Sequence, residues 1–471
     1  MKENMLKKFV LKKVFLFLSN LSPTNLIRAI IVAEKFLIYN KEAKAMTAGL
    51  KNAFRQGHPA TKLALETFAS LSKQCQKKFV ENFVINAAIL GVQKRVALEN
   101  KNQFGLPGFF VISPTAKCNL KCVGCYAAEY VKDEGLSWEE VDRILQEAKQ
   151  LGIYFITISG GEPFVWPHLF KMLEKHSDMY FQIYTNGTLI TKEIAQKLAQ
   201  LGNAAPGISV EGFEKETSQR RGAGVFEKVL AAMQNLKKAG VLFGFSATCV
   251  KNNIETLMSN EFIDFYAKQG CRFGWYFQYV PIGREPDVEL MALPEQRNRL
   301  RLRVKEIRNI KPIFVGDFWN DGPWVEGCMA GGRSGGYFHI NANGNVEPCA
   351  FVQFYVDNIK GKSLLEVLKS PFFEALREAA PYCENKNLLS PCCIIDNPQV
   401  LRDVIKKSNA KPSYENGDKL LSDPKITDFL DKYAKDYKAI VDPVWEKEKK
   451  SYFYSRSWPE RWQENLEKNK K

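Results

Sequence analysis

The sequence predicts an α/β fold that is built on a partial (β/α)6 barrel. Between residues 105 and 310, six short apolar runs alternate with amphipathic stretches of helical periodicity. This alternation is the order of a parallel sheet whose strands are joined by helices. Polar residues and glycines follow the ends of several apolar runs. In TIM-like barrels the ligand sites lie at the carboxyl ends of the strands, so we expect these residues to form one site.

Four regions are expected along the chain. They are a basic helical N-terminal region at 1–104, the barrel core at 105–310, a small cysteine-rich extension at 311–400 and a helical tail at 401–471 that is rich in aromatic and basic residues. The expected strands lie at 109–113, 154–158, 180–184, 207–210, 242–249 and 273–280. The expected helices between them lie at 138–150, 167–177, 192–201, 224–239 and 254–269.

The composition indicates a globular protein that keeps its cysteines reduced. The 471 residues are 45% hydrophobic and 25% charged, which is ordinary for such a protein. The eleven cysteines are odd in number, and we find no secretory leader pattern, which argues against a disulfide scaffold. Metal ligation in the cytoplasm fits these cysteines better.

Positive charge is concentrated at the start of the chain. Of the net charge of +15, residues 1–60 contribute +8, from eleven Lys and Arg against three Asp and Glu. The stretch 5–21 mixes lysines with apolar residues and predicts either a packed surface helix or a helix that lies at an anionic membrane surface. We expect a cytoplasmic protein, with peripheral contact at the inner face of the membrane as the open alternative. Nucleic-acid binding is the less favoured explanation of the charge.

Three closely spaced cysteines follow the first apolar run. In the segment Cys118-Asn-Leu-Lys-Cys122-Val-Gly-Cys125, three thiolates can hold one face of a metal centre, and the loop offers no fourth cysteine or histidine. Structural zinc sites and [4Fe–4S] clusters normally take four protein ligands. The triplet therefore favours a cluster that keeps one iron for a small molecule, with a structural zinc loop as the alternative.

A glycine-rich turn follows the second apolar run. It reads Gly160-Gly161-Glu162-Pro163, in which the glycines allow the backbone to approach a ligand and Pro163 fixes the exit of the chain. Together with the cysteine triplet, this turn resembles the radical S-adenosylmethionine (SAM) superfamily. That family has a C-x3-C-x-aromatic-C cluster motif and a GGEP motif that holds the amino group of SAM.

The chain departs from the family motif at one position. Gly124 stands where the family has an aromatic residue that shields the cluster, and Tyr126 follows the third cysteine. We expect Tyr126 to provide this shielding instead.

The resemblance implies both the cofactors and the reaction. Thiolates of Cys118, Cys122 and Cys125 would bind three irons of a [4Fe–4S] cluster, and SAM would chelate the fourth. An electron, supplied by a reductant such as ferredoxin or flavodoxin, would cleave SAM to methionine and a 5′-deoxyadenosyl radical that removes hydrogen from an unactivated carbon. Family positions for the SAM ribose and carboxylate match Asn186, Ser209, Glu211 and Arg221. Taken singly, these last residues are also typical of turns and solvated surfaces.

A second set of cysteines lies in the extension. An Asn-Gly turn at 343–344 between short extended runs predicts a hairpin that returns Cys349 to the neighbourhood of Cys328. The C-x15-G-x4-C spacing resembles the start of SPASM and twitch extensions, which carry auxiliary iron–sulfur clusters, although the full seven-cysteine pattern is missing. We expect one auxiliary [4Fe–4S] cluster, or a structural zinc, at Cys328, Cys349, Cys383 and one of Cys392 and Cys393. His339, in the same hairpin, is the one histidine of interest.

The sequence leaves the substrate open. Auxiliary-cluster members of the family often act on peptides or proteins, which is the favoured substrate class, and a membrane lipid is the alternative. A hypothesis of another class is a non-catalytic metal-binding module that contacts membrane or nucleic acid. It fails to explain why polar motifs recur at successive strand ends.

Overall fold

The fold is described from a computed structural model that covers residues 56–102, 104–132, 135–452, 464 and 467. The helix expected at 5–21, and most of the basic segment, lie outside the described residues. In the described part of the chain, no helix is both long enough and apolar enough to cross a membrane.

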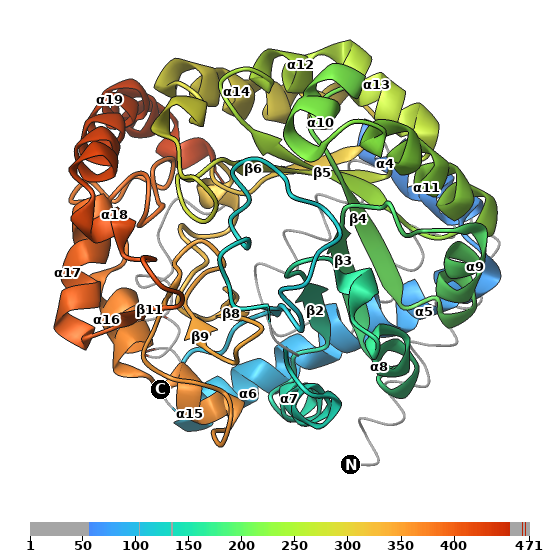
Figure 1. The fold of residues 1–471 in the computed structure, drawn as a ribbon, viewed down its shortest axis with the longest axis horizontal. Coiled ribbons are helices and arrows are strands. Elements are labelled where there is room, and N and C mark those ends of the chain that lie inside the picture. Colours follow the sequence, from blue (N-terminus) through green and yellow to red (C-terminus); the bar gives the residue numbers. More distant parts are fainter. Residues whose placement is uncertain (1–55, 103, 133–134, 453–463, 465–466, 468–471) are drawn as a thin grey trace.

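A parallel sheet forms the centre of the molecule, as predicted (Figure 1). The first seven strands lie side by side in chain order, so that each of the first six pairs with the next one along the chain. They are β1 Phe110–Ile112, β2 Phe155–Ile158, β3 Tyr180–Thr185, β4 Ala204–Val210, β5 Gly244–Cys249, β6 Phe273–Gln278 and β7 Phe314–Asp317. All six predicted strands are present. The sequence prediction missed β7, because a strand of four residues that contains Gly316 gives only a weak apolar signal.

The predicted hairpin extends this same sheet. Strand β8 (His339–Ile340) pairs parallel to β1, and β9 (Val346–Glu347) pairs antiparallel to β8. The cysteine-rich segment is therefore joined to the barrel edge by main-chain hydrogen bonds.

Helices cover the outer face of the curved sheet (Figure 1). They are α7 Trp138–Gln150, α8 Leu169–Lys175, α9 Lys192–Leu201, α10 Glu214–Arg221, α11 Val225–Ala239, α12 Ile254–Met258, α13 Asn260–Gln269 and α14 Pro294–Ile310. All of them except α10 bury apolar residues against the sheet; in α7 the buried stripe includes Val141, Ile144 and Leu145. The single helix expected at 254–269 is two helices, because the Ser259 hydroxyl accepts from the Phe262 N–H and starts α13 anew.

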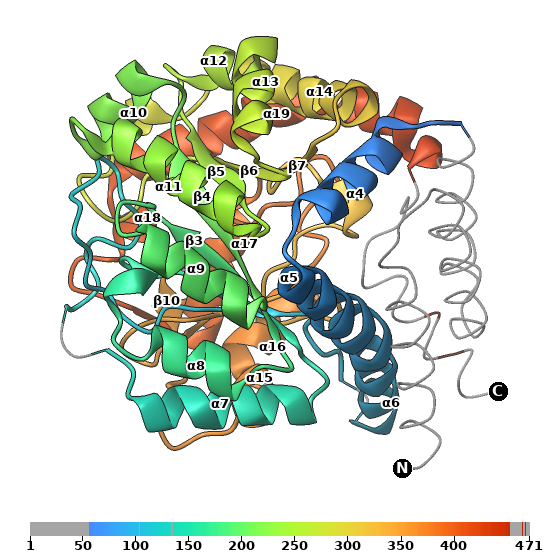
Figure 2. The ribbon, with the colours of Figure 1, turned by 90° about the vertical axis from the view of Figure 1, so that its right-hand side faces the viewer.

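The N-terminal helices lie across the amino ends of the strands, on the side opposite the cysteine loop (Figure 2). They are α4 Pro59–Ser70, α5 Lys73–Lys78, the π-helix η1 Phe79–Gly91 and α6 Val92–Asn102. Their polar side chains bind the loops that lead into the strands: Asn82 donates to the Met179 carbonyl at 2.8 Å and Arg95 to the Gly152 carbonyl at 2.6 Å. These helices cover the end of the barrel away from the predicted site.

C-terminal elements complete the ring of helices (Figure 1). They are β10 Phe354–Tyr355, α15 Leu364–Leu368, α16 Pro371–Ala379, α17 Pro398–Ser408, β11 Lys411–Pro412, α18 Lys419–Ser422 and α19 Pro424–Glu448. Helix α19 packs against α14 and buries Tyr433, Tyr437 and Trp445. These three aromatic residues of the tail therefore dock on the body of the protein.

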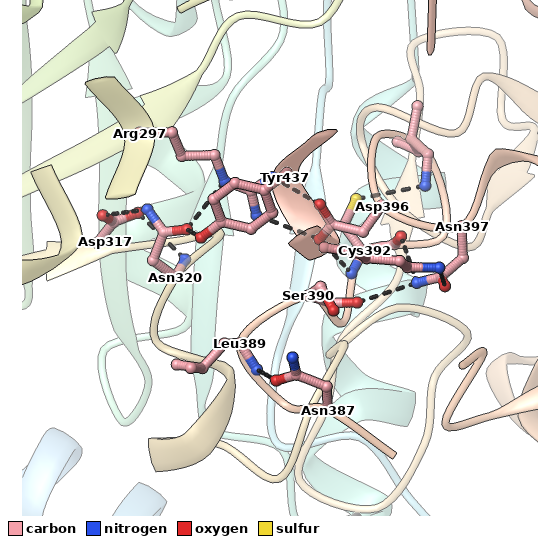
Figure 3. Close-up of polar contacts among 12 residues, drawn as sticks. Arg297, Asp317, Asn320, Asn387, Leu389, Ser390, Cys392, Asp396, Asn397 and Tyr437 are labelled. Atoms are coloured by element: carbon pink, nitrogen blue, oxygen red, sulfur yellow. Dashed lines mark hydrogen bonds and ion pairs between the residues drawn. The ribbon is translucent and has the colours of Figure 1, made fainter. Parts of the chain in front are cut away.

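A buried ion pair joins α14 to the C-terminal region (Figure 3). Arg297 binds the Asp396 carboxylate through two hydrogen bonds, of 2.6 and 3.1 Å, and both side chains are fully buried. The Tyr437 ring lies 3.7 Å from the guanidinium carbon and shields it further. Removal of one partner of such a buried pair strongly destabilises a protein, because the other charge is left buried and unpaired.

We expect Arg297→Ala to lower the free energy of unfolding by about 3–5 kcal/mol, because it leaves the Asp396 carboxylate buried and unpaired. The measurement is urea unfolding followed by circular dichroism. Arg299→Ala is the matched control, since Arg299 pairs with Glu255 at the surface and should change stability by less than about 1 kcal/mol. Equal effects of the two substitutions would contradict the prediction.

Candidate functional site

One large cavity lies at the carboxyl ends of the strands and brings most of the predicted site together. Its volume is about 780 Å³. It is lined by Cys118, Cys122 and Cys125, and by six of the nine residues that were expected to shield the cluster or to hold SAM: Tyr126, Gly160, Gly161, Asn186, Ser209 and Arg221. The other three, Glu162, Pro163 and Glu211, do not line it.

The cysteine loop is held in place by main-chain and arginine contacts. The Val123 N–H donates to the Arg220 carbonyl at 2.9 Å, and Arg284 donates to the Cys122 carbonyl at 3.0 Å. The Arg221 guanidinium lies 3.8 Å from the Cys122 sulfur. Burial raises the pKa of the Cys118 thiol. A positive metal centre would favour the thiolates, so three thiols beside an arginine fit the proposed cluster.

Gly160 and Gly161 allow the turn after β2 to pack against the segment that leads into the cysteine loop. A methyl group on Gly160 would lie 2.4 Å from the Thr115 carbonyl oxygen, and one on Gly161 would lie 2.1 Å from that of Lys117. The Gly161 N–H donates to the Thr115 carbonyl at 2.9 Å. Glycine is therefore needed here so that the β2 turn can lie directly against the chain that carries Cys118.

Glu162 ties the ends of two strands together. Its carboxylate accepts from the Thr185 hydroxyl and from the Asn186 N–H, both at 2.7 Å, and burial raises its pKa. The side-chain amide of Asn186 in turn donates to Oδ1 of Asn119 at 2.8 Å, inside the cysteine loop. Pro163 begins the short 3-10 helix that follows. Glu162 and Pro163 thus shape the site from behind the cavity wall.

Glu211 positions two arginines. Its Oε1 accepts from Arg220 at 2.6 Å and from Nε and Nη2 of Arg221 at 2.8 and 2.5 Å. Burial opposes the charge of Arg221, but Glu211 and the neighbouring cysteines raise its pKa above the ordinary value. Both arginines line the cavity. The Glu211 carboxylate therefore fixes two positively charged side chains at the cavity. Arg220 belongs to the site as well, although it was not among the residues predicted from the sequence.

Tyr279 occupies the space that an aromatic residue at position 124 would need. A methyl group on Gly124 would lie 2.7 Å from the Tyr279 ring, and Gly124 has a φ of +61°. Tyr126 lies on the other side, where its hydroxyl is 2.7 Å from the Ser159 Oγ and its ring faces Phe351. Two tyrosines therefore flank the loop. Tyr279 lies directly after β6, and the sequence signal for its role was the glycine at position 124.

Four of the five downstream cysteines gather in a second, smaller cavity. Cys328, Cys349, Cys392 and Cys393 line it. A hydrogen bond with Cys393 lowers the pKa of Cys328 to about 7, whereas burial raises that of Cys349 to about 12. The hairpin prediction is confirmed, because it brings Cys349 to the same cavity as Cys328.

The predicted ligand set differs from this arrangement at Cys383. Its sulfur faces the Pro381 and Asn387 carbonyls of its own loop, at 3.6 and 3.7 Å, and it does not line the cavity. Both adjacent cysteines, 392 and 393, do line it. Among the described residues, no three or more His, Cys, Asp or Glu side chains converge as the ligands of a single metal ion.

His339 joins the hairpin to the barrel. Its ring nitrogens lie 2.7 Å from the Ser113 hydroxyl and 2.6 Å from the Glu347 carboxylate, and all three side chains are buried. Glu347 also accepts from the Tyr130 hydroxyl, five residues after Cys125, at 2.9 Å. The trio has the composition of a hydrolytic triad but lines neither of the two cavities. It links the two cysteine segments instead.

Comparison with known families identifies both cysteine regions. Residues 112–258 match the family described as the Radical SAM superfamily, and residues 328–397 match a family described as an iron–sulfur cluster-binding domain, SPASM. The chain carries a radical SAM domain followed by a SPASM domain. As a radical SAM enzyme it uses a [4Fe–4S] cluster with SAM, and its SPASM domain implies auxiliary iron–sulfur binding. The zinc-loop and non-catalytic alternatives are therefore not supported.

Several proteins are similar to this chain over more than half of its length. The AdoMet-dependent heme synthase of Methanosarcina barkeri is 25% identical over 316 residues, which are 59% of this chain and 88% of that protein. The mycofactocin maturase MftC of Mycobacterium tuberculosis is 28% identical over 286 residues, 55% of this chain and 71% of that protein. The structure of Streptococcus suis SuiB bound to S-adenosylmethionine matches with a TM-score of 0.53 and 21% identity over 78% of this chain and 87% of that one, a likeness of fold.

We expect Gly124→Ala to destabilise the radical SAM domain more than Gly224→Ala does. Both positions have positive φ, +61° and +73°, which costs an alanine about 1–2 kcal/mol. Only the methyl group at 124 meets another side chain, so overpacking should add about 1–3 kcal/mol. Urea unfolding measures both, and in a Tyr279→Ala background the Gly124→Ala substitution should lose the added part of its cost. If Gly124→Ala lowers the free energy of unfolding by no more than Gly224→Ala does, the predicted clash with Tyr279 is refuted.

Proposed function

We propose that this radical SAM enzyme abstracts hydrogen from an unactivated carbon of a peptide or protein substrate that enters the barrel cavity. The [4Fe–4S] cluster, when bound, supplies the electron that cleaves SAM into methionine and a 5′-deoxyadenosyl radical. Cys118, Cys122 and Cys125 are proposed to hold that cluster. Cys328, Cys349, Cys392 and Cys393 are proposed to hold an auxiliary one.

The proposed SAM contacts follow from the cavity wall. Asn186, Ser209 and Arg221 line the cavity beside the cysteine loop. The Arg221 guanidinium, fixed by Glu211, carries the positive charge that a SAM carboxylate requires. We propose that Glu162, Pro163 and Glu211 support these residues without touching SAM.

The peptide proposal rests chiefly on two glutamines of the cavity wall. Gln182 and Gln278 line the cavity, and the Nε2 atom of each is buried without a hydrogen-bond acceptor among the described residues. A carboxamide carries both a donor and an acceptor, which is the complement of a peptide group. Burial of an unpaired amide is costly, so a substrate that pairs it gains affinity. A lipid chain would leave both amides unpaired.

The rest of the cavity accepts apolar side chains. Beyond the cysteine loop it continues along the inside of β6 and β7, where Trp275, Phe277 and Phe318 line it. A cavity of about 780 Å³ lies within the range of small-molecule sites, so it can admit SAM and a short segment rather than a whole domain. A SuiB structure of the same fold was solved bound to its precursor peptide SuiA, with a TM-score of 0.52, so the fold accommodates a peptide.

A tetrapyrrole is the second candidate substrate. The heme synthase relative matches over 88% of its length, and aromatic side chains of the kind that stack on a planar macrocycle line the cavity. The two proposals differ in the role of Gln182 and Gln278. A peptide would pair with both amides, whereas a macrocycle would bind chiefly to the aromatic side chains of the wall.

The test uses peptides from a digest of cells grown in deuterated medium. With SAM and dithionite under anaerobic conditions, we expect 5′-deoxyadenosine that carries one deuterium, read by mass spectrometry, because the radical takes its hydrogen from peptide carbon. The Cys118→Ala/Cys122→Ala/Cys125→Ala variant is the control and should form none. Formation of 5′-deoxyadenosine without deuterium would contradict the peptide proposal, and none at all from iron-loaded protein would contradict the radical chemistry.

A binding measurement tests the tetrapyrrole as the second candidate substrate. Iron coproporphyrin is added to the protein, and a shift of its Soret absorption reports binding. Binding that is weakened by Phe318→Ala but unchanged by Gln182→Leu would favour the tetrapyrrole. No shift, together with deuterium transfer from peptides, would leave the peptide proposal alone.

A further inference from the structure

We propose that the indole N–H of Trp319 is a hydrogen-bond donor to the auxiliary iron–sulfur cluster and raises its reduction potential. The inference rests on the proposed ligand set of the second cavity. Trp319 is not proposed as a metal ligand. It would change the reduction potential of the auxiliary cluster without binding iron.

The indole lies in the wall of the cysteine cavity. Trp319 lines it together with Cys328, Cys349, Cys392 and Cys393, and the residue is 3% exposed. Its Nε1 atom is buried and finds no acceptor among the described residues. A buried unpaired donor costs free energy, so a native structure that retains one is expected to satisfy it in the functional state. The cluster sulfurs would be the acceptors in this cavity.

The indole is held rigidly by aromatic packing. Its ring centre lies 4.8 Å from that of Phe351 and 5.2 Å from that of Phe318, each at a steep angle. Phe351 in turn contacts a cysteine of the cavity, since its main-chain N–H donates to the Cys349 sulfur at 3.4 Å. The donor is therefore fixed relative to at least one proposed ligand.

A buried network joins Asn320, the residue that follows Trp319, to the loop that carries Cys392 (Figure 3). Asn320, the next residue, accepts from Arg297 Nε at 2.9 Å and donates to Asp317 at 2.7 Å. Arg297 also binds Asp396, whose carboxylate accepts from the Cys392 N–H at 3.0 Å. One guanidinium thus holds the turn that carries Trp319 and the loop that carries Cys392.

Hydrogen bonds to the sulfurs of an iron–sulfur cluster are one of the factors that set its potential. A donor stabilises the reduced state more than the oxidised state, because reduction adds negative charge to the sulfurs. Removal of the Trp319 donor should therefore shift the potential to more negative values while the thiolate ligands remain.

The experiment uses the full chain with Cys118→Ala/Cys122→Ala/Cys125→Ala, so that only the auxiliary cluster is reconstituted. Iron content is measured first, and the potential is then titrated by EPR with and without Trp319→Phe. We expect equal iron and a more negative potential in Trp319→Phe. Trp445→Phe, a buried tryptophan on α19 outside both cavities, is the matched control and should leave the potential unchanged.

The other outcomes separate the inference from its premise. An unchanged potential with iron retained, or loss of iron on Trp319→Phe alone, would overturn the role of the indole as a donor and leave the ligand set standing. No iron in the reference protein would overturn the ligand set as well. A measurement on protein without a tryptophan substitution adds an independent check: with 15N-indole labelling, pulsed EPR of the reduced cluster should show a 15N coupling, and its absence would also refute the hydrogen bond.

Discussion

The pairing of β8 with β1 is the constraint on which the two cysteine sites depend. Main-chain hydrogen bonds of 2.9 Å join Val111 to Phe338 and Ser113 to Ile340. Strand β1 leads directly into the loop of Cys118, and the β8–β9 hairpin leads directly to Cys349. A domain that was attached only by a linker would leave the separation of the two sites free. Here the sheet itself sets it, and the buried Ser113–His339–Glu347 contacts reinforce the same junction.

Aromatic side chains fill the space between the two sites. The Tyr126 ring, next to Cys125, lies 5.3 Å from the Phe351 ring, and Phe351 in turn contacts Trp319 at 4.8 Å. Such packing excludes water, and low polarity strengthens each hydrogen bond and charge contact in the surroundings. The barrel cavity and the cysteine cavity are thus neighbours that are separated by aromatic side chains.

Buried charges in this enzyme serve to hold loops. Arg297 pairs with Asp396 and reaches Asn320, and Glu211 pairs with Arg220 and Arg221. Arg297 joins segments that are distant in sequence, whereas Glu211 joins the end of β4 to helix α10, which follows it directly. The cost of burying such groups is offset only when all partners are present, so these contacts favour one arrangement of the loops around each site.

The sequence alone determined the parallel α/β order, the cysteine triplet and the hairpin, because each depends on local periodicity or spacing. Apolar runs predicted six strands, and an Asn-Gly turn predicted the return of Cys349. Only the tertiary structure decided which polar residues face the cavity: Glu162 and Glu211 lie at strand ends, as expected, yet point behind its wall. It also decided that Cys383 stands apart, that Tyr279 covers Gly124 and that a seventh strand closes on β6. Side-chain direction and contacts between distant segments follow from packing, which spacing along the chain does not encode.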